Sequence, residues 1–242
     1  MITLLKKEIN EFFSTITGYI VVVVFLLAIG FFMWIFPGQY NVLDSGYASL
    51  DTLFTLAPWI FLFLVPAVTM RMIADEKKSG TMELLLTRPI SDLQIVISKY
   101  LASLMLVLLA LIPTLIYFFS IYHLGNPTGN IDVGGTIGSY TGLFFLAAIY
   151  AAIGIFASSL TSNQIIAFII ALLIAFFFYM GFDLLSGMWI FSSIDTFVAD
   201  LGINVHYRSM SRGVIDTRDI VYFISVILVF IFLTKTIIQN RR

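Results

Sequence analysis

The stretch RMIADEKKSGTMELLLTRPISDLQIVISK, residues 71–99, is a hydrophilic segment that apolar runs of membrane length flank on both sides. It holds five of the thirteen basic residues of the chain and four acids. A segment this polar between two bilayer spans must lie in water, and its basic surplus predicts the cytoplasmic side. Within it Leu84, Leu85 and Leu86 form a short apolar ridge, which favours docking onto a soluble partner.

The composition of the whole chain is that of an integral membrane protein. Of the 242 residues 60% are hydrophobic and 11% are charged, whereas about 25% are charged in an ordinary soluble domain. The net charge of −1 gives no electrostatic reason to expect nucleic acid as a partner. Because there is no cysteine, disulfides, thiolate nucleophiles and cysteine-ligated metals are excluded.

Six apolar stretches are long enough to cross a bilayer as helices, which takes about 20 residues each. They are residues 18–36, 52–70, 100–122, 139–160, 165–185 and 220–238. The fourth and fifth belong to one long stretch, which we expect to break at residues 158–164, where Thr161 and Gln164 have the spacing of a capping box. Runs of this length are not barrel strands. The predicted fold is therefore all-α, with six transmembrane helices.

Residues 1–16 have an amphipathic pattern that predicts a helix lying in the membrane interface before the first span. The charged residues Lys6, Lys7 and Glu11 lie largely opposite the apolar face. That face comprises Ile2, Leu5, Ile9, Phe12, Phe13 and Ile16. The alternative is a frayed beginning of the first span.

The distribution of basic residues predicts the orientation, because six spans place both termini on one side. Three basic residues, Arg208, Arg212 and Arg218, fall in segments predicted outside, and the other ten fall inside. Such a bias indicates cytoplasmic termini. The inside set is Lys6, Lys7, Arg71, Lys77, Lys78, Arg88, Lys99, Lys235, Arg241 and Arg242.

The hydrophilic segment 71–99 is predicted to contain one short helix between the second and third spans. Gly80 should end the helix that leaves the second span, and Thr81 is a plausible N-cap for the next. Pro89 prevents that helix from continuing. Ser91 and Gln94 have capping-box spacing and should begin the third span. The alternative is a solvated loop with a few interfacial leucines.

The segment EKKSGTMELLLTRPISDLQIVISKYLA, residues 76–102, resembles the cytoplasmic coupling loop of type-2 ABC transporter permeases. HYRSMSRGVIDTRDIVYFISV, residues 206–226, is similar to the segment before their last span. Among these permeases the chain looks most like the gliding-motility-associated ABC permease subunits of Bacteroidota. The resemblance implies a coupling helix that fits a cleft on a separate ATP-binding subunit. The residues that it implies for this docking are Asp75, Glu76, Gly80, Glu83, Leu84, Leu85, Arg88 and Pro89.

The resemblance also implies a role in ATP-driven export or in a motility- or secretion-associated step, in the bacterial cytoplasmic (inner) membrane. The chain lacks the motif Gly-x-x-x-x-Gly-Lys-Ser/Thr that cradles ATP phosphates. We therefore expect no enzyme activity and no cofactor in this chain, with ATP and Mg²⁺ bound by the partner. Further expected partners are membrane lipids and either a second permease copy or a paralogous membrane subunit, with or without an extracytoplasmic domain.

The outer loop, residues 186–219, is predicted to contain a short amphipathic helix around Ile194 to Val205. His206, Arg208, Arg212 and Arg218 follow it as an extracytoplasmic rim. One interpretation is a docking rim for an anionic cargo or an extracytoplasmic partner, and the other is a structural cap over the bundle.

Other candidate sites are weaker. His123 and His206 lack the spacing of a metal site. Asp183 ends the fifth span, where an acid more often faces interfacial water than marks a proton or substrate path. Gly134, Gly138 and Gly142 have the spacing of a close helix contact, which we interpret as ordinary packing.

Two functions remain open on the sequence. The first is the permease of an ABC transporter, and the second is a non-transporting membrane scaffold or assembly subunit that docks an ATPase through the same loop. An intramembrane enzyme or a secondary transporter is a remote third, since charged positions in the middle of the spans are nearly absent.

Overall fold

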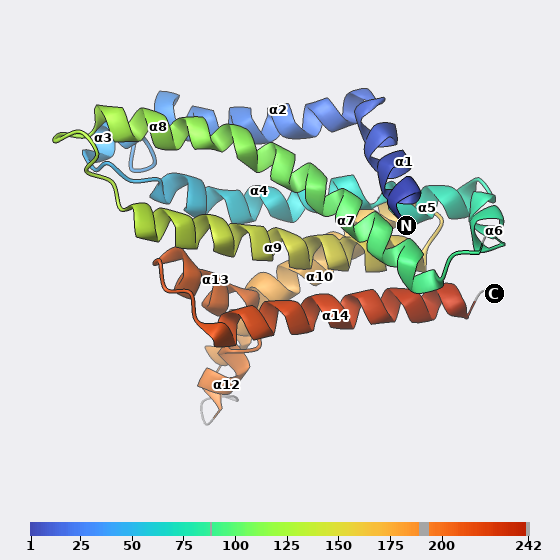
Figure 1. Ribbon diagram of the computed structural model, residues 1–242. Coiled ribbons are helices and arrows are strands. Elements are labelled where there is room, and N and C mark those ends of the chain that lie inside the picture. The colour runs from blue at the N-terminus through green and yellow to red at the C-terminus, as the bar shows by residue number, and fades with distance from the viewer. Residues whose placement is uncertain (88, 189–193, 241–242) are drawn as a thin grey trace.

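The computed structural model describes residues 1–87, 89–188 and 194–240, and within these residues it contains helices and no strand. Six helical passes are long and apolar enough to cross a membrane, which confirms the predicted fold class. They run side by side along one bundle axis (Figure 1). The passes are α2 (Ile16–Gly30) with the π-helix η1 (Phe31–Ile35), α4 (Asp51–Thr69), α7 (Asp92–Leu111) with the 3₁₀ turn η2 (Ile112–Thr114) and α8 (Leu115–Leu124), α9 (Val133–Leu160), α10 (Gln164–Phe176) with the π-helix η3 (Phe177–Gly181) and α11 (Phe182–Ser186), and α14 (Thr217–Gln239).

The fourth pass, α9, is the centre of the bundle. In the 18-residue apolar stretch by which α9 can cross a membrane, 78% is buried inside the protein. The corresponding share is 28% for the fifth pass and 22% for the sixth. Small residues such as Ala147, Ala151 and Gly154 are among its buried positions, and at Gly154 an added Cβ would collide with Thr69 of α4. Small side chains let helix backbones approach closely in a membrane. The sequence of α9 thus allows its neighbours to pack tightly around it.

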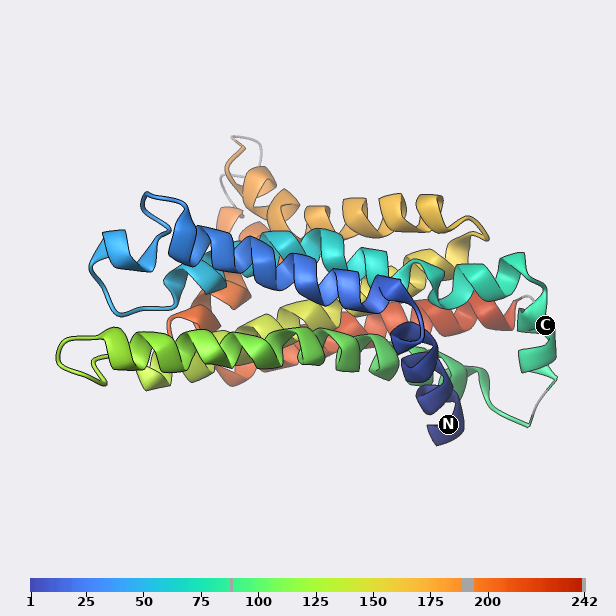
Figure 2. The same ribbon diagram turned by 90° about the horizontal axis from the view of Figure 1, so that it is seen from above.

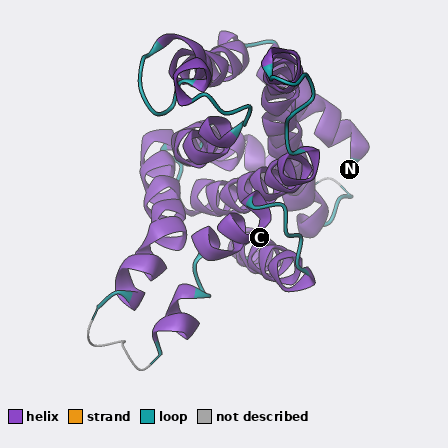
Figure 3. Cartoon of the chain, turned by 90° about the vertical axis from the view of Figure 1, so that its left-hand side faces the viewer, coloured by secondary structure: helices purple, strands orange, loops and turns teal. Residues whose placement is uncertain are grey.

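The short helices gather at the two ends of the bundle (Figures 1 and 2). One end, which we call the terminal face, carries α1 (Ile2–Phe13), α5 (Arg71–Lys78), α6 (Thr81–Leu86) and the last turn of α14. The opposite end, the far face, carries α3 (Val42–Ser45) and α13 (Ile203–Ser211). An end-on view from the far face shows α12 (Asp195–Ala199) standing away from the bundle (Figure 3).

Local signals place several helix ends where the sequence predicts them. Ser91 Oγ accepts a hydrogen bond from the Gln94 N–H at 3.3 Å, and Gln94 Oε1 accepts one from the Ser91 N–H at 3.2 Å. This capping box begins α7, as predicted. Gly80 has a φ of 71°, a left-handed conformation that favours glycine, and it separates α5 from α6.

Two predicted caps are wrong. The N-cap of α6 is Gly80 and not Thr81, whose hydroxyl instead bonds to Ser79. The N-cap of α10 is Asn163, whose Oδ1 accepts from the Ile165 N–H at 2.9 Å. A capping box from Thr161 does not form, because Gln164 is the first residue of α10 and the Thr161 hydroxyl accepts from the Asn163 N–H at 3.1 Å. The Gln164 side-chain amide donates to Asp75.

The amphipathic face of α1 matches the prediction in part, because Leu5, Ile9, Phe12 and Phe13 pack against the core. The buried positions are Leu4, Glu8 and Phe12, while Ile2 is 67% exposed. Ile16 is 77% exposed and begins α2. The helix crosses the end of the bundle rather than continuing α2 (Figures 1 and 2). Its buried face follows an i, i+4, i+8 row that includes a carboxylate, because a lysine on α7 lies opposite.

Candidate functional site

Part of the predicted docking segment forms an exposed helix at the terminal face. Met82 is buried and anchors α6, and Leu85 is half-buried against the core. Leu84 is 68% exposed and lies next to the exposed Glu83. Gly80 and Pro89, on either side of α6, are exposed as well. Arg88 and the side chain of Leu86 lie outside the described residues.

The two acids of the predicted docking set, Asp75 and Glu76, belong to α5 and face the protein. The side-chain amide of Gln164 donates a hydrogen bond to Asp75 Oδ1. The side chain of Glu76 is only 12% exposed. The structure therefore separates the set into outward residues on and around α6 and inward acids on α5. Their docking role stays a prediction.

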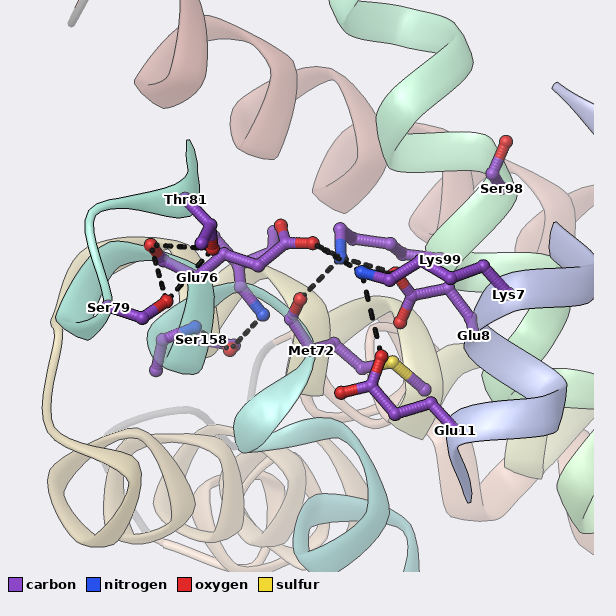
Figure 4. Close-up of polar contacts among 12 residues, drawn as sticks. Lys7, Glu8, Glu11, Met72, Glu76, Ser79, Thr81, Ser98, Lys99 and Ser158 are labelled. Atoms are coloured by element: carbon purple, nitrogen blue, oxygen red, sulfur yellow. Dashed lines mark hydrogen bonds and ion pairs between the residues drawn. The ribbon is translucent and has the colours of Figure 1, made fainter. Parts of the chain in front are cut away.

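Glu76 belongs to a buried charged cluster that joins three helices (Figure 4). At its centre is Lys99 of α7, whose side chain is 0% exposed. Its Nζ lies 2.9 Å from Glu8 Oε1 of α1 and 2.9 Å from Glu76 Oε1 of α5. Nζ also donates to the Met72 carbonyl at 2.6 Å. An ammonium group has three protons, so these three acceptors satisfy it completely.

Lys7 supplies a second cation at the edge of this cluster. Its Nζ lies 3.4 Å from Glu76 Oε1, 3.7 Å from Glu8 Oε1 and 3.5 Å from Glu11 Oε2. Partial burial by itself lowers the pKa of Lys7, but the carboxylates of Glu8, Glu76 and Glu11 outweigh it and raise the pKa above its ordinary value. Lys7 therefore stays charged, and together with Lys99 it balances the two carboxylates of Glu8 and Glu76.

Sequence reasoning missed this cluster. It treated Lys99 as a basic residue that flanks the third span, whereas α7 begins at Asp92 and places Lys99 two turns inside the helix. The capping box at Ser91 and Gln94 was the available signal, because it fixes how deep Lys99 lies. No comparable signal pointed to Glu8, which interrupts an otherwise apolar face.

A buried hydroxyl defines the junction between α4 and α5. Ser158 Oγ of α9 accepts hydrogen bonds from the N–H groups of Ile73 and Ala74, both at 3.0 Å, and donates to the Met70 carbonyl at 2.8 Å. The ammonium group of Lys77 also donates to the Ser159 carbonyl. These bonds hold α5 against the end of α9.

The predicted rim residues at the far face do not form one group. Arg208 and Arg212 line a cavity of about 330 Å³ together with Asp51, Trp59, Tyr179 and Tyr207. His206 instead faces α14, where its Nδ1 lies 2.7 Å from Asp219 Oδ1 and its ring stacks on Tyr222 at 3.9 Å. Arg218 is exposed in the first turn of α14.

Asp183 lies near this cavity and has a protein partner. Its Oδ2 accepts a hydrogen bond from Asn204 Nδ2 of α13 at 2.5 Å. The acid therefore joins the end of the fifth pass to α13. In the described part of the chain, no group of three or more His, Cys, Asp or Glu side chains is arranged to hold a metal ion.

Comparison with known proteins adds one match. The sequence model of a family described as "ABC-2 family transporter protein" matches residues 2–239. No curated protein matches the chain significantly.

Proposed function

Because this chain belongs to the ABC-2 family of transporter proteins and is a membrane permease subunit of that type, we propose how it is energised. A separate ATP-binding subunit, which the family implies as a partner, docks on α6. Its ATP hydrolysis then drives export or a motility- or secretion-associated step. We further propose that the terminal face is cytoplasmic and that the membrane is the bacterial inner membrane. The excess of basic residues in the segments of this face supports that orientation.

The exposure of Leu84 is the observation that carries the proposal. Leaving an apolar side chain in water costs about 25 cal/mol for each Å². Leu84 is 68% exposed on a helix that Met82 anchors to the core, and Glu83 and Pro89 beside it are exposed as well. A soluble subunit that covers α6 would remove this cost.

Two membrane subunits would enclose the transport path in our proposal. The centre of this single subunit is packed, since Leu146, Ile149, Tyr150 and Ile153 of α9 are each 0% exposed. A path that runs between two subunits does not require this core to open.

Replacing Leu84 by aspartate tests the docking site. A charge on α6 should abolish co-purification of the ATP-binding subunit, because an unpaired charge in the contact would lose its water. Insertion of the permease should be normal, since Leu84 does not pack in the core. Co-purification from detergent-solubilised membranes that co-express both subunits measures the effect.

Leu43→Asp is the matched control, because Leu43 is 63% exposed on α3 at the far face. This variant should retain the ATP-binding subunit. Retention of the subunit by Leu84→Asp, with unchanged ATP hydrolysis, would contradict docking through α6.

A further inference from the structure

α5 connects the exposed α6 to the bundle, and polar links attach it on several sides. Asp75 binds Gln164 at the start of α10, and Lys77 binds the Ser159 carbonyl at the end of α9. Glu76 binds Lys99 of α7. Only Ser79 and Gly80 separate α5 from α6. A displacement of α6 must therefore reach α5 directly.

The link through Glu76 differs from the others because it joins three helices at one atom. Lys99 Nζ is 2.9 Å from a carboxylate of α5 and 2.9 Å from a carboxylate of α1, and Lys99 itself is part of a membrane-spanning helix. Since the side chain of Lys99 is 0% exposed, water does not weaken these contacts. Movement of α5 thus acts on α1 and on the third pass at the same point.

The surroundings of Glu76 allow this contact to change. A pocket of about 70 Å³ lies between α1 and α5, with Lys7, Glu8 and Glu76 in its lining. Glu76 Oε2 is buried and has no hydrogen-bond partner, while Lys7 Nζ is 3.4 Å from Oε1 of the same carboxylate. A small shift of α5 can therefore move the carboxylate from Lys99 towards Lys7 without leaving it unpaired.

We propose that Lys99 is a positioning residue for energy coupling. It transmits the movement of α6 to α1 and to the membrane-spanning α7, and Glu76 is the partner that changes. This inference rests on the proposed function, in which the ATP-binding subunit moves α6.

The test compares the complex of permease and ATP-binding subunit with and without the charges of Lys99, Glu8 and Glu76. A spectroscopic label is attached to α1 through Lys6→Cys, an exposed site in a chain that has no other cysteine. In a second preparation the label is attached beside α6 through Lys78→Cys, because Lys78 is exposed as well. The complex in lipid vesicles is then trapped with ATP and vanadate. In the wild-type background both labels should respond to trapping.

The decisive variant combines Lys99→Met, Glu8→Gln and Glu76→Gln, because Lys99→Met alone would leave buried carboxylates uncompensated. It should still co-purify with the ATP-binding subunit, since α6 is untouched. The label on α1 should no longer respond, and the permease should no longer stimulate ATP hydrolysis. Glu76→Gln alone keeps the side-chain shape and should weaken the response at α1. Lys78→Met, at an exposed lysine of α5, is the control that should leave it unchanged.

A wild-type response at Lys78→Cys without one at Lys6→Cys would overturn the proposal. So would a normal response at α1 in the triple variant or, should that variant not fold, in Glu76→Gln. Failure of the wild-type chain to bind the ATP-binding subunit would instead refute the proposed function.

Discussion

Ser158 illustrates how one buried side chain sets the course of the backbone. In a continuous helix the N–H groups of Ile73 and Ala74 would bond to the carbonyls of Thr69 and Met70. Ser158 Oγ accepts from both N–H groups instead, and it donates to the Met70 carbonyl. At the break between α4 and α5, Ser158 therefore gives a partner to these two N–H groups and to the Met70 carbonyl.

Ser158→Ala should lower the stability of the folded chain by about 1–3 kcal/mol, because it leaves buried donors without an acceptor. Thermal unfolding in detergent measures the loss. Ser225→Ala is the control, since Ser225 is exposed and bonds only to the Val221 carbonyl within its own helix. Equal unfolding temperatures for the two variants would contradict this account of the junction.

The other residue-scale feature, the cluster around Lys99, could not be predicted from the sequence. Lys99 and Glu8 are 91 positions apart, and Ser158 and Ile73 are 85 apart. Their contacts depend on how whole helices pack, and no local pattern encodes that packing. Gly80 and the Ser91–Gln94 box were predictable because they act within one turn of chain.

At the scale of elements, α9 and α13 make a contact that depends on glycine. A Cβ added at Gly138 would lie 2.7 Å from Gly213 Cα and 2.8 Å from the Met210 carbonyl oxygen, and these are backbone atoms that cannot turn aside. Gly142 similarly faces Met210. The predicted close packing is therefore observed at Gly138 and Gly142 but not at Gly134, and the neighbour is the short far-face helix α13 rather than another span.

Gly138→Ala should destabilise the chain by about 1–3 kcal/mol through overpacking. Gly134→Ala is the matched control on the same helix, because a Cβ there meets only Asp132 Oδ1, at an ordinary 3.4 Å. Thermal unfolding of the two variants checks the difference. A larger loss for Gly134→Ala would show that α13 does not pack as described.

Elements were predictable to different degrees. The six passes follow from apolar length, which the sequence states directly. The face of α1 was predicted in part, since Leu5, Ile9, Phe12 and Phe13 pack against the core as expected. The burial of Glu8 against Lys99 was not predictable, because an apolar pattern gives no signal for it. The outward position of α6 residues and the inward position of Asp75 and Glu76 depend on the turn at Gly80 together with packing against α9 and α10.

At the scale of the whole molecule, α5, α6, the N-terminus and the last turn of α14 lie at one face (Figure 1). Single cysteines can test which side of the membrane this face occupies, because the chain has none of its own. Ser45→Cys and Thr128→Cys lie at exposed positions of the far face, and Lys78→Cys at an exposed position of the terminal face.

An impermeant maleimide should label Ser45→Cys and Thr128→Cys in intact cells and Lys78→Cys only after permeabilisation. This result is expected because basic residues next to spans are retained in the cytoplasm. Labelling of Lys78→Cys alone in intact cells would reverse the orientation and place α6 out of reach of ATP.

The central position of α9 has a consequence for biogenesis. A chain is made from its N-terminus, so α9 leaves the ribosome before the fifth and sixth passes that later cover it. Until then the surfaces of α9 that contact α10 and α14 lack these neighbours, although 78% of its 18-residue apolar stretch is buried in the finished fold. Its alanines, glycines and isoleucines are stable in both surroundings, since packing in a bilayer exchanges lipid contacts for helix contacts. The most buried helix of the bundle is thus also one that can remain stable in the bilayer before the fifth and sixth passes are inserted.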